Sequence, residues 1–449
     1  MFELETPHEE FRMFVTIPKN RLLLMSQGAM GLLLLTATFL NADPATAGNF
    51  ADTASGTTPT GEVTGEVTGE VQDAAESSQL NWPTARGDAQ STGHADQTLP
   101  DKLQVIWEYK AGEAIETTPV VVGNRVFVSD VMGKVYAIDR ASGKEIWTVD
   151  FDTGFLASPS VKSGQLLIGD IDGNLYKLNA LTGKELWRKS TDGEIQGSVA
   201  FHGENVLAAS GDGKLHCFRL KDGEKVWTYE ANDQIRCSPT VAGDRTFLGG
   251  CDGQLHVVDL KTGEAVGKTL ELGGPTGSTP SVVGEKAFLP IMDGVVLAFD
   301  WKAEKELWQY MDDERPQEYR NSAAVTGDLI VLSSQFKQVD AISTATGKLK
   351  WRHTLRRRAD ASPVIAGKDV WIAATDGRLI RLELDNGTEE KWSYEIRGSF
   401  LAGPAIAGQE LFIADDDGVV RCFGGQKDQN AVDAAVSSKI NPAVLPQGL

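Results

Sequence analysis

Cysteine and histidine are scarce in this sequence, and neither is arranged to hold a metal. Among 449 residues, four are cysteine and six are histidine. No CxxC pair, adjacent cysteine pair or CxxCH motif occurs, which excludes zinc ribbons and covalently attached c-type haem. His216 and His256 stand at positions where other copies of a repeat carry Tyr136 and Tyr176. We therefore interpret both histidines as aromatic packing residues and expect no metal site.

The four cysteines leave one question open. Cys237 and Cys251 flank one expected hairpin. Exported proteins form disulfides, so a bond between these two residues is one interpretation. Buried free thiols in strands are the other interpretation.

Positive charge is also in short supply. The chain has 43 Lys and Arg against 63 Asp and Glu, a formal net charge of -20. No basic stripe with interleaved aromatic residues occurs. A surface this acidic repels nucleic acid and anionic lipid, so we expect neither as a partner.

Long apolar runs are absent except near the N-terminus. Lys19 and Arg21 precede an apolar stretch over 22–40, and Ala45-Thr-Ala47 follows as a small-residue cleavage site. This order predicts a signal peptide over 1–47 and export to the periplasm or the extracellular space. An uncleaved anchor is the alternative, since the stretch approaches the length that spans a bilayer, and only then would the protein meet a membrane. The segment has no cysteine, so a lipoprotein-type anchor is not supported.

Two further segments lack the pattern of a packed core. Residues 48–80 repeat Gly-Glu-Val-Thr among small and acidic residues, and they bury too little apolar area to fold, so we expect a disordered linker. The polar tail over 424–449 has no periodicity. Residues 81–102, which begin Asn81-Trp-Pro-Thr, are expected to lie against the folded body.

What the sequence does have is a repeat. The phrase Leu175-Tyr-Lys-Leu-Asn-Ala-Leu-Thr-Gly-Lys-Glu-Leu-Trp187 recurs with a period of about 40 residues, and its tryptophan marks each copy. The copies lie at Trp107, Trp147, Trp187, Trp227, Trp308, Trp351 and Trp392. At the expected position 267 the chain carries glycine instead. A fixed period of this length is typical of a closed repeat architecture.

Each repeat contains four short strand patterns separated by Asp, Gly and Ser turns. This pattern predicts an all-β, eight-bladed β-propeller over 81–423, with four-stranded antiparallel blades. The first outer strand, 103–109, precedes any inner strand, and the last inner strands, up to Phe423, have no outer strand after them. We therefore expect residues 103–109 to complete the eighth blade and close the ring, which leaves no open sheet edge.

The phrase [DN]-x-x-[TS]-G-[KE]-x-x-W, with the inner-strand motif Ser158-Pro-Ser, resembles the tryptophan-docking repeat of the PQQ-like, quinoprotein-type propeller family. The resemblance covers about residues 81–423. It implies that each tryptophan stacks between neighbouring blades on the glycine of the Thr-Gly-Lys turn, at Gly143, Gly183, Gly263 and Gly347. The Gly-His and Trp-Asp signatures of WD40 propellers are absent.

Two functional classes within this resemblance compete. Pyrroloquinoline-quinone (PQQ) alcohol and sugar dehydrogenases need the quinone, calcium, a catalytic Asp and, in many members, an adjacent Cys-Cys pair, which this chain lacks. The other class resembles BamB, the compact propeller of outer-membrane protein assembly. Because nearly every repeat has the minimum length, we expect a monomeric, non-catalytic scaffold for an unidentified envelope protein. We expect no cofactor, and PQQ with calcium stays the alternative.

One candidate surface is the channel mouth, where each innermost strand begins. The polar candidates are Glu116, Gln196, Arg236, Asn321 and Asp360, and the remaining ring positions are Leu156, Gly277 and Leu401. Contact with a ligand or partner is one interpretation, and ordinary solvated channel lining is the other. We expect no catalytic residue.

The other candidate surface is the loop region around the sixth repeat. Its inner strand follows an extended segment, its Gln335–Gln338 turn has lost the Asp-Gly pair, and a basic run enters the next repeat. Departures from a repeat often map to the binding face, although a tolerated insertion explains them equally. The predicted interaction residues are Asp312, Asp313, Glu314, Arg315, Arg320, Arg356, Arg357 and Arg358.

Overall fold

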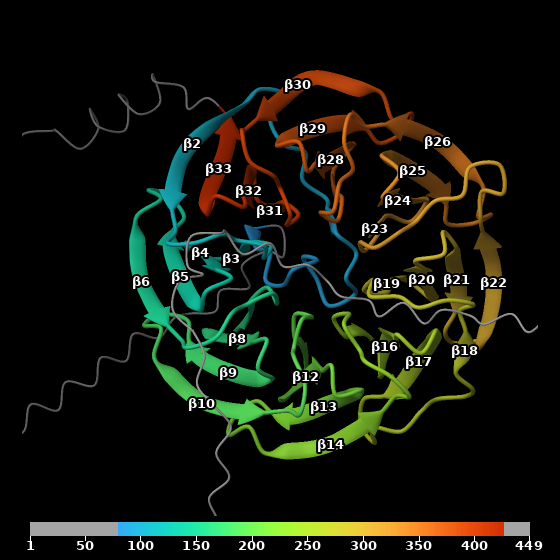
Figure 1. Cartoon of the computed structure of the whole chain (residues 1–449), viewed down its shortest axis with the longest axis horizontal. Helices are drawn as coiled ribbons and strands as arrows, with labels where there is room; N and C mark the ends of the chain where they lie inside the picture. The colour runs from blue at the N-terminus through green and yellow to red at the C-terminus, as the bar shows by residue number, and fades with distance from the viewer. Residues whose placement is uncertain (1–79, 426–449) are drawn as a thin grey trace, which may run out of the picture. The chain divides into compact units, whose positions relative to one another are not determined.

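The structure is a computed structural model that describes residues 80–425, and these residues contain no α-helix (Figure 1). Eight antiparallel sheets of four strands follow one another around a ring in chain order, which confirms the predicted eight-bladed propeller. Blade 1 is β3 to β6, each later blade takes the next four strands up to β30, and blade 8 is β31 to β33 with β2. Short β1 (His94–Ala95) pairs with blade 7.

Within each blade the strands run from the ring centre outward. The innermost strands are β3 (Val120–Val122), β7 (Ser160–Lys162), β11 (Ala200–His202), β15 (Thr240–Ala242), β19 (Ser281–Val283), β23 (Ala324–Val325), β27 (Val364–Ala366) and β31 (Ala405–Ala407). The second strands are β4 (Arg125–Ser129), β8 (Gln165–Gly169), β12 (Asn205–Ala209), β16 (Arg245–Gly249), β20 (Lys286–Pro290), β24 (Leu329–Ser333), β28 (Asp369–Ala373) and β32 (Glu410–Ala414). The third strands are β5 (Lys134–Asp139), β9 (Asn174–Asn179), β13 (Lys214–Arg219), β17 (Gln254–Asp259), β21 (Val296–Asp300), β25 (Gln338–Ser343), β29 (Arg378–Glu383) and β33 (Val419–Gly425). The outer strands are β6 (Glu145–Asp150), β10 (Glu185–Ser190), β14 (Lys225–Glu230), β18 (Leu270–Glu271), β22 (Lys305–Tyr310), β26 (Leu349–Thr354), β30 (Glu389–Glu395) and β2 (Leu103–Lys110).

Burial follows from this stacking. The second and third strands carry continuous apolar runs, such as Leu166 to Ile168 in β8, because neighbouring blades cover both of their faces. The outer strands alternate between exposed and half-buried residues, as β10 does, because only one face meets the next blade.

The ring closes as predicted from the sequence. Strand β2 pairs antiparallel with β33, from Leu103 opposite Gly425 to Lys110 opposite Val419. The last blade therefore takes its outer strand from the beginning of the described chain, and the ring is left without a seam.

Each of the seven tryptophans joins its own blade to the next one. Each indole N–H donates to a carbonyl of that neighbouring blade: Trp107 to Arg140, Trp147 to Ala180, Trp187 to Leu220, Trp227 to Leu260, Trp308 to Thr344, Trp351 to Leu384 and Trp392 to Leu103. Where the facing turn carries a glycine, a Cβ would collide with the indole, as at Gly143 and Gly263. The glycine is needed both for this contact and for its positive φ, which is 69° at Gly143.

Part of the segment 81–102, for which the sequence predicted only contact with the folded body, lies across one end of the central channel. Residues 81–95, the blue trace crossing the ring centre in Figure 1, bond to one innermost strand after another. Trp82 exchanges backbone hydrogen bonds with Val121, and its side chain is buried. Further backbone contacts reach Val161, Val241, Val282, Val325 and Ile365. We call residues 81–95 the plug.

Arg86 anchors the plug on the far side of the channel. Its Nη2 donates to Ala323 O at 2.8 Å and to Pro363 O at 2.9 Å, in blades 6 and 7. Burial lowers the pKa of Arg86 to about 10, against the opposing effect of Asp88. One side chain thus ties the plug to two blades.

The fold also bears on the predictions for the histidines, the cysteines and the terminal segments. His216 Nε2 lies 2.9 Å from Asp212 and His256 Nε2 lies 3.0 Å from Asp252, as Tyr136 bonds Asp130 in blade 1, so the histidines occupy the aromatic slot. The disulfide interpretation is wrong, since Cys237 and Cys251 are not bonded to each other and are free thiols. The predicted signal segment 1–47, most of linker 48–80 and most of the tail 424–449 lie outside the described residues.

Candidate interaction face at the channel mouth

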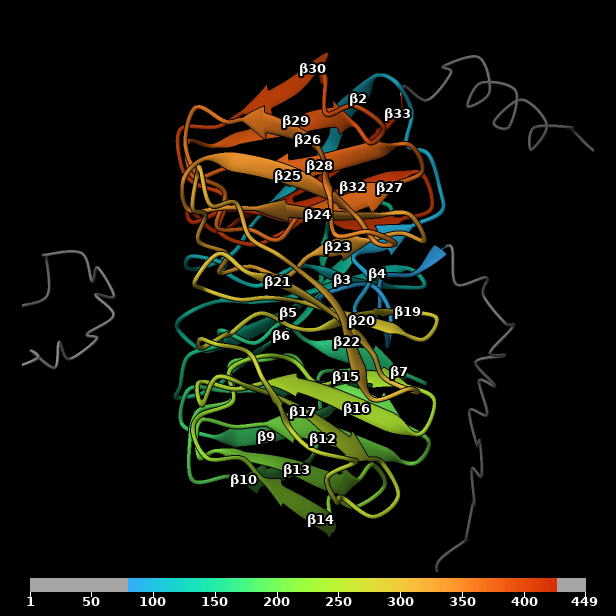
Figure 2. The ribbon, with the colours of Figure 1, turned by 90° about the vertical axis from the view of Figure 1, so that its right-hand side faces the viewer.

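The two faces of the ring differ in what they carry. We call one face the rim face, which carries the connections between blades and the turns between second and third strands. The opposite face carries the other turns and the plug, and we call it the plug face (Figure 2). Both ends of the described chain lie on the plug face: Arg140 donates to Leu80 O, and Gly425 lies opposite Leu103. The rim face therefore carries neither end of residues 80–425.

Most candidate residues of the channel mouth contact neighbours outside the candidate set. Arg236 donates to Gln234 Oε1 at 2.8 Å and lies 3.9 Å from Glu194, on its own side of the mouth. Desolvation, and then the negative charge of Asp416, raises the pKa of Glu116. Gln196 is half-buried.

The remaining two mouth candidates contact their neighbours. Buried Asn321 uses its amide nitrogen to donate to Ser333 Oγ at 2.6 Å and to Ala359 O at 3.1 Å. Asp360 accepts from Gln335 Nε2 at 3.0 Å and pairs with Arg358 at 2.9 Å. These side chains hold the loops between blades 5, 6 and 7 in place.

The mouth does not fit the quinone and calcium of the dehydrogenase class. That site needs a carboxylate and amide oxygens gathered around one calcium ion. Here Asp360 is bound by an arginine, and Asn321 directs its amide nitrogen to three neighbouring oxygens. Across residues 80–425, no three His, Cys, Asp or Glu side chains are placed to share a metal ion.

The acidic half of the predicted interaction rim is partly structural. Asp312 is bound by Arg352 at 2.6 Å, and Arg352 also bonds Asp340, which accepts from buried Tyr319 at 2.8 Å. Burial is the largest single influence on the pKa of Asp312, and it acts to raise that pKa. The hydrogen bonds from Arg352 and from the backbone, together with the charge of Arg352, outweigh burial and lower the pKa. This network, which was not predicted from the sequence, fixes the extended loop. Asp313 and Glu314 remain exposed.

The basic half of that rim faces solvent. Arg356, Arg357 and Arg358 are all exposed, and Arg356 reaches Glu395 only at 3.8 Å. Thr375 N donates to Arg358 O at 3.0 Å, so the blade 6 to blade 7 loop is fixed at its base. The three guanidinium groups are thus exposed on a held backbone, and Arg358 is also paired with Asp360.

The residues that lie beside Arg356–Arg358 were not predicted from the sequence. Leu355 N donates to Lys337 O, which brings the altered blade 6 turn beside it. That turn exposes Lys337 and also Phe336, whose exposed fraction is 55%. The lost Asp-Gly pair was the available signal, because a turn without it presents larger side chains.

The arginines of the rim face are concentrated on blades 6 to 8. The connections into blades 1 to 5 carry six acidic residues and one basic residue: Glu113, Glu116, Asp152, Asp192, Glu194, Asp233 and Arg236. The connections into blades 6 to 8 carry six arginines, which we call the basic sector: Arg315, Arg320, Arg356, Arg357, Arg358 and Arg397. The same connections also carry five acidic residues: Asp312, Asp313, Glu314, Glu318 and Asp360. On a chain of net charge -20, the basic sector is thus a concentration of arginine with carboxylates beside it.

Comparison with known proteins gives a family and a fold. A family profile described as outer membrane protein assembly factor BamB matches residues 100–229, 171–266 and 238–430. No curated protein sequence matches the chain. Among solved structures, BamB from Moraxella catarrhalis is 19% identical with a TM-score of 0.63, covering 73% of this chain and 99% of that one.

Dehydrogenases share the fold to a similar degree. The quinohemoprotein alcohol dehydrogenase from Comamonas testosteroni is 15% identical with a TM-score of 0.68, covering 79% of this chain and 82% of that one. The computationally designed Ika8 protein is 14% identical with a TM-score of 0.64, covering 70% of this chain and 98% of that one. Likeness at these identities shows the propeller and leaves the function open.

Proposed function

The chain belongs to the family described as outer membrane protein assembly factor BamB, and from this we propose a non-catalytic scaffold that holds an envelope protein on its rim face. The basic sector is the contact we assign to the partner. The predicted signal segment supports a place outside the cytoplasm, in the periplasm or beyond. Within residues 80–425, no helix is long and apolar enough to cross a membrane.

The observation that carries this proposal is the form of the rim face. It carries neither end of residues 80–425, its connections are short, and its arginines project from loops held by internal hydrogen bonds. Fixed loops with exposed charge reduce the ordering cost of binding and attract a partner of opposite sign.

Charge reversal tests the proposal. The triple variant R356E/R357E/R358E should reduce recovery of the cross-linked envelope partner by at least about tenfold, since each lost contact also becomes a repulsion. K144E/K184E/K261E is the matched control, because it makes the same charge change at exposed turns on the plug face. Equal recovery from both triple variants would refute the basic sector as the contact.

A quinone-dependent dehydrogenase is the second candidate, favoured by the shared fold with quinohemoprotein alcohol dehydrogenase. Adding PQQ and calcium to the purified protein separates the two proposals. The scaffold predicts no stoichiometric quinone absorbance and no dye reduction with alcohols or sugars. Bound quinone with turnover would replace the scaffold with the enzyme.

A further inference from the structure

One interface of the ring breaks the docking pattern, and it lies between blades 4 and 5. Gly267 stands where blade 4 should carry its tryptophan, and Glu304 stands where the facing turn should carry its glycine. Glu304 keeps the left-handed backbone of that position, with a φ of 51°. Both members of the docking pair are therefore changed together, and outer strand β18 is reduced to two residues.

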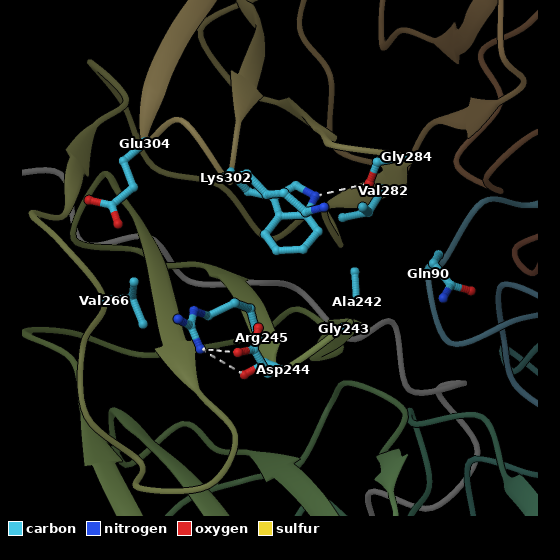
Figure 3. Close-up of a pocket in the computed structure, with 11 residues that line it drawn as sticks. Gln90, Ala242, Gly243, Asp244, Arg245, Val266, Val282, Gly284, Lys302 and Glu304 are labelled. Atoms are coloured by element: carbon cyan, nitrogen blue, oxygen red, sulfur yellow. Dashed lines mark hydrogen bonds and ion pairs between the residues drawn. The ribbon is translucent and has the colours of Figure 1, made fainter.

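A cavity of about 880 Å³ lies at this interface, on the plug face (Figure 3). It is bordered by the turn at Gly243 and Asp244, by Val266, and by Trp301 of blade 5. Its volume falls within the range of small-molecule binding sites. Among the eight interfaces of the described ring, this is the one without a docking tryptophan at the repeat position.

Trp301 gives this cavity a flat aromatic wall. Its Nε1 donates to Gly284 O at 3.0 Å, which fixes the orientation of the ring. The ring centroid lies 5.8 Å from that of Phe247, at an interplanar angle of 72°, so the indole reaches across to blade 4. Trp301 lines the cavity, and its side chain is only half-buried.

The charged residues that line the cavity balance in number: Asp244 and Glu304 against Arg245 and Lys302. Arg245 pairs with Asp244 at 3.0 Å and with Asp259 at 2.6 Å. Lys302 pairs with Glu285 at 2.9 Å, and its ammonium lies 5.5 Å from the Trp301 ring centroid. On a chain of net charge -20, a balanced lining favours a neutral polar ligand over an ion.

We propose that this cavity binds a neutral carbohydrate, a function separate from partner binding on the rim face. A pyranose presents one apolar C–H face and a polar edge. The C–H face matches the Trp301 indole, and the hydroxyls match the carboxylates of Asp244 and Glu304 and the amide of Gln90. A partner's tryptophan fits less well, because Glu304 has replaced the glycine on which an indole would rest.

Calorimetric titration of the full chain with chitohexaose, cellohexaose and maltohexaose tests this site. At least one of these neutral oligosaccharides should bind in a saturable manner. W301A should weaken that binding by roughly fivefold to tenfold, whereas W301F should keep most of it because the aromatic wall remains. M311A, which removes an exposed side chain on the rim face, is the control and should leave sugar binding unchanged.

Three results would overturn the assignment. They are no binding of any of the three oligosaccharides, binding that is unaffected by W301A, and Trp301-dependent binding of the peptide acetyl-Gly-Trp-Gly in place of sugar. The last result would identify a peptide-docking site. The R356E/R357E/R358E variant should bind sugar like the wild type, so failure here leaves the rim-face proposal standing.

Discussion

At the residue scale, the docking glycines serve two physical needs that can be separated. Gly387 has a φ of 72°, and a Cβ there would collide with the Trp351 indole. Gly164 has a φ of 71°, and a Cβ there would meet nothing within 4 Å. The two positions share backbone strain and differ only in the indole contact.

Alanine at each position measures the difference. G164A should lower the free energy of unfolding by about 1 kcal/mol, the cost of the left-handed backbone. G387A should cost about 2 kcal/mol more, because the indole must shift. Denaturant midpoints of the two variants check this, and equal losses would show that the tryptophan contact contributes little.

The buried thiols give the fold a dependence on alkaline pH. Burial raises the pKa of Cys217 and of Cys237 to about 12. In the unfolded chain the same thiols ionise near their ordinary pKa of about 8.5. Their contribution to stability is therefore complete below about pH 8.5 and declines as the pH rises toward 12.

Unfolding at pH 8 and at pH 10 tests this sign. Each thiol should contribute a loss of up to about 1.4 kcal/mol per pH unit over that interval. In C217A/C237A the pH-dependent part of the loss should shrink, whatever the baseline stability. An unchanged slope would mean that the two thiols are not the groups that titrate.

At the element scale, we expect closure strand β2 to contribute more to stability than an average outer strand. Removing β2 (103–110) would expose the edge of β33 and delete the docked Trp107. We expect a large drop in melting temperature together with aggregation, because the open edge can pair with another chain. Removing residues 268–271 around β18, where no tryptophan docks, should cost far less. Circular dichroism melting compares the two deletions, and similar losses would contradict the closure account.

The elements also show why sequence reasoning succeeded or failed. Alternation, turns and the tryptophan period predict strands because each repeat must bury both faces of its middle strands. The plug could not be predicted, since Pro83 and Arg86 bond to backbone atoms of distant blades and leave no period behind. The Arg352 network was missed for the same reason, because Asp312 and Asp340 meet only in three dimensions.

At the scale of the whole molecule, two departures from the repeat lie on opposite faces. The basic sector lies on the rim face, which the stretched spacing around blade 6 indicated in the sequence. The Trp301 cavity lies on the plug face, at the position where the sequence showed only a missing tryptophan. A missing residue marks a place without saying whether the neighbours fill it, so only the structure shows the cavity.

Site-specific photo-cross-linking in intact cells tests the central claim, that the rim face holds an envelope protein. A photoreactive phenylalanine analogue replaces Phe336 on the rim face in one variant and Leu181, at a turn of the plug face, in another, since both side chains are exposed. Our account predicts a discrete cross-linked envelope protein from position 336 and little from position 181. Cross-links from position 181 alone, or none from position 336, would contradict it.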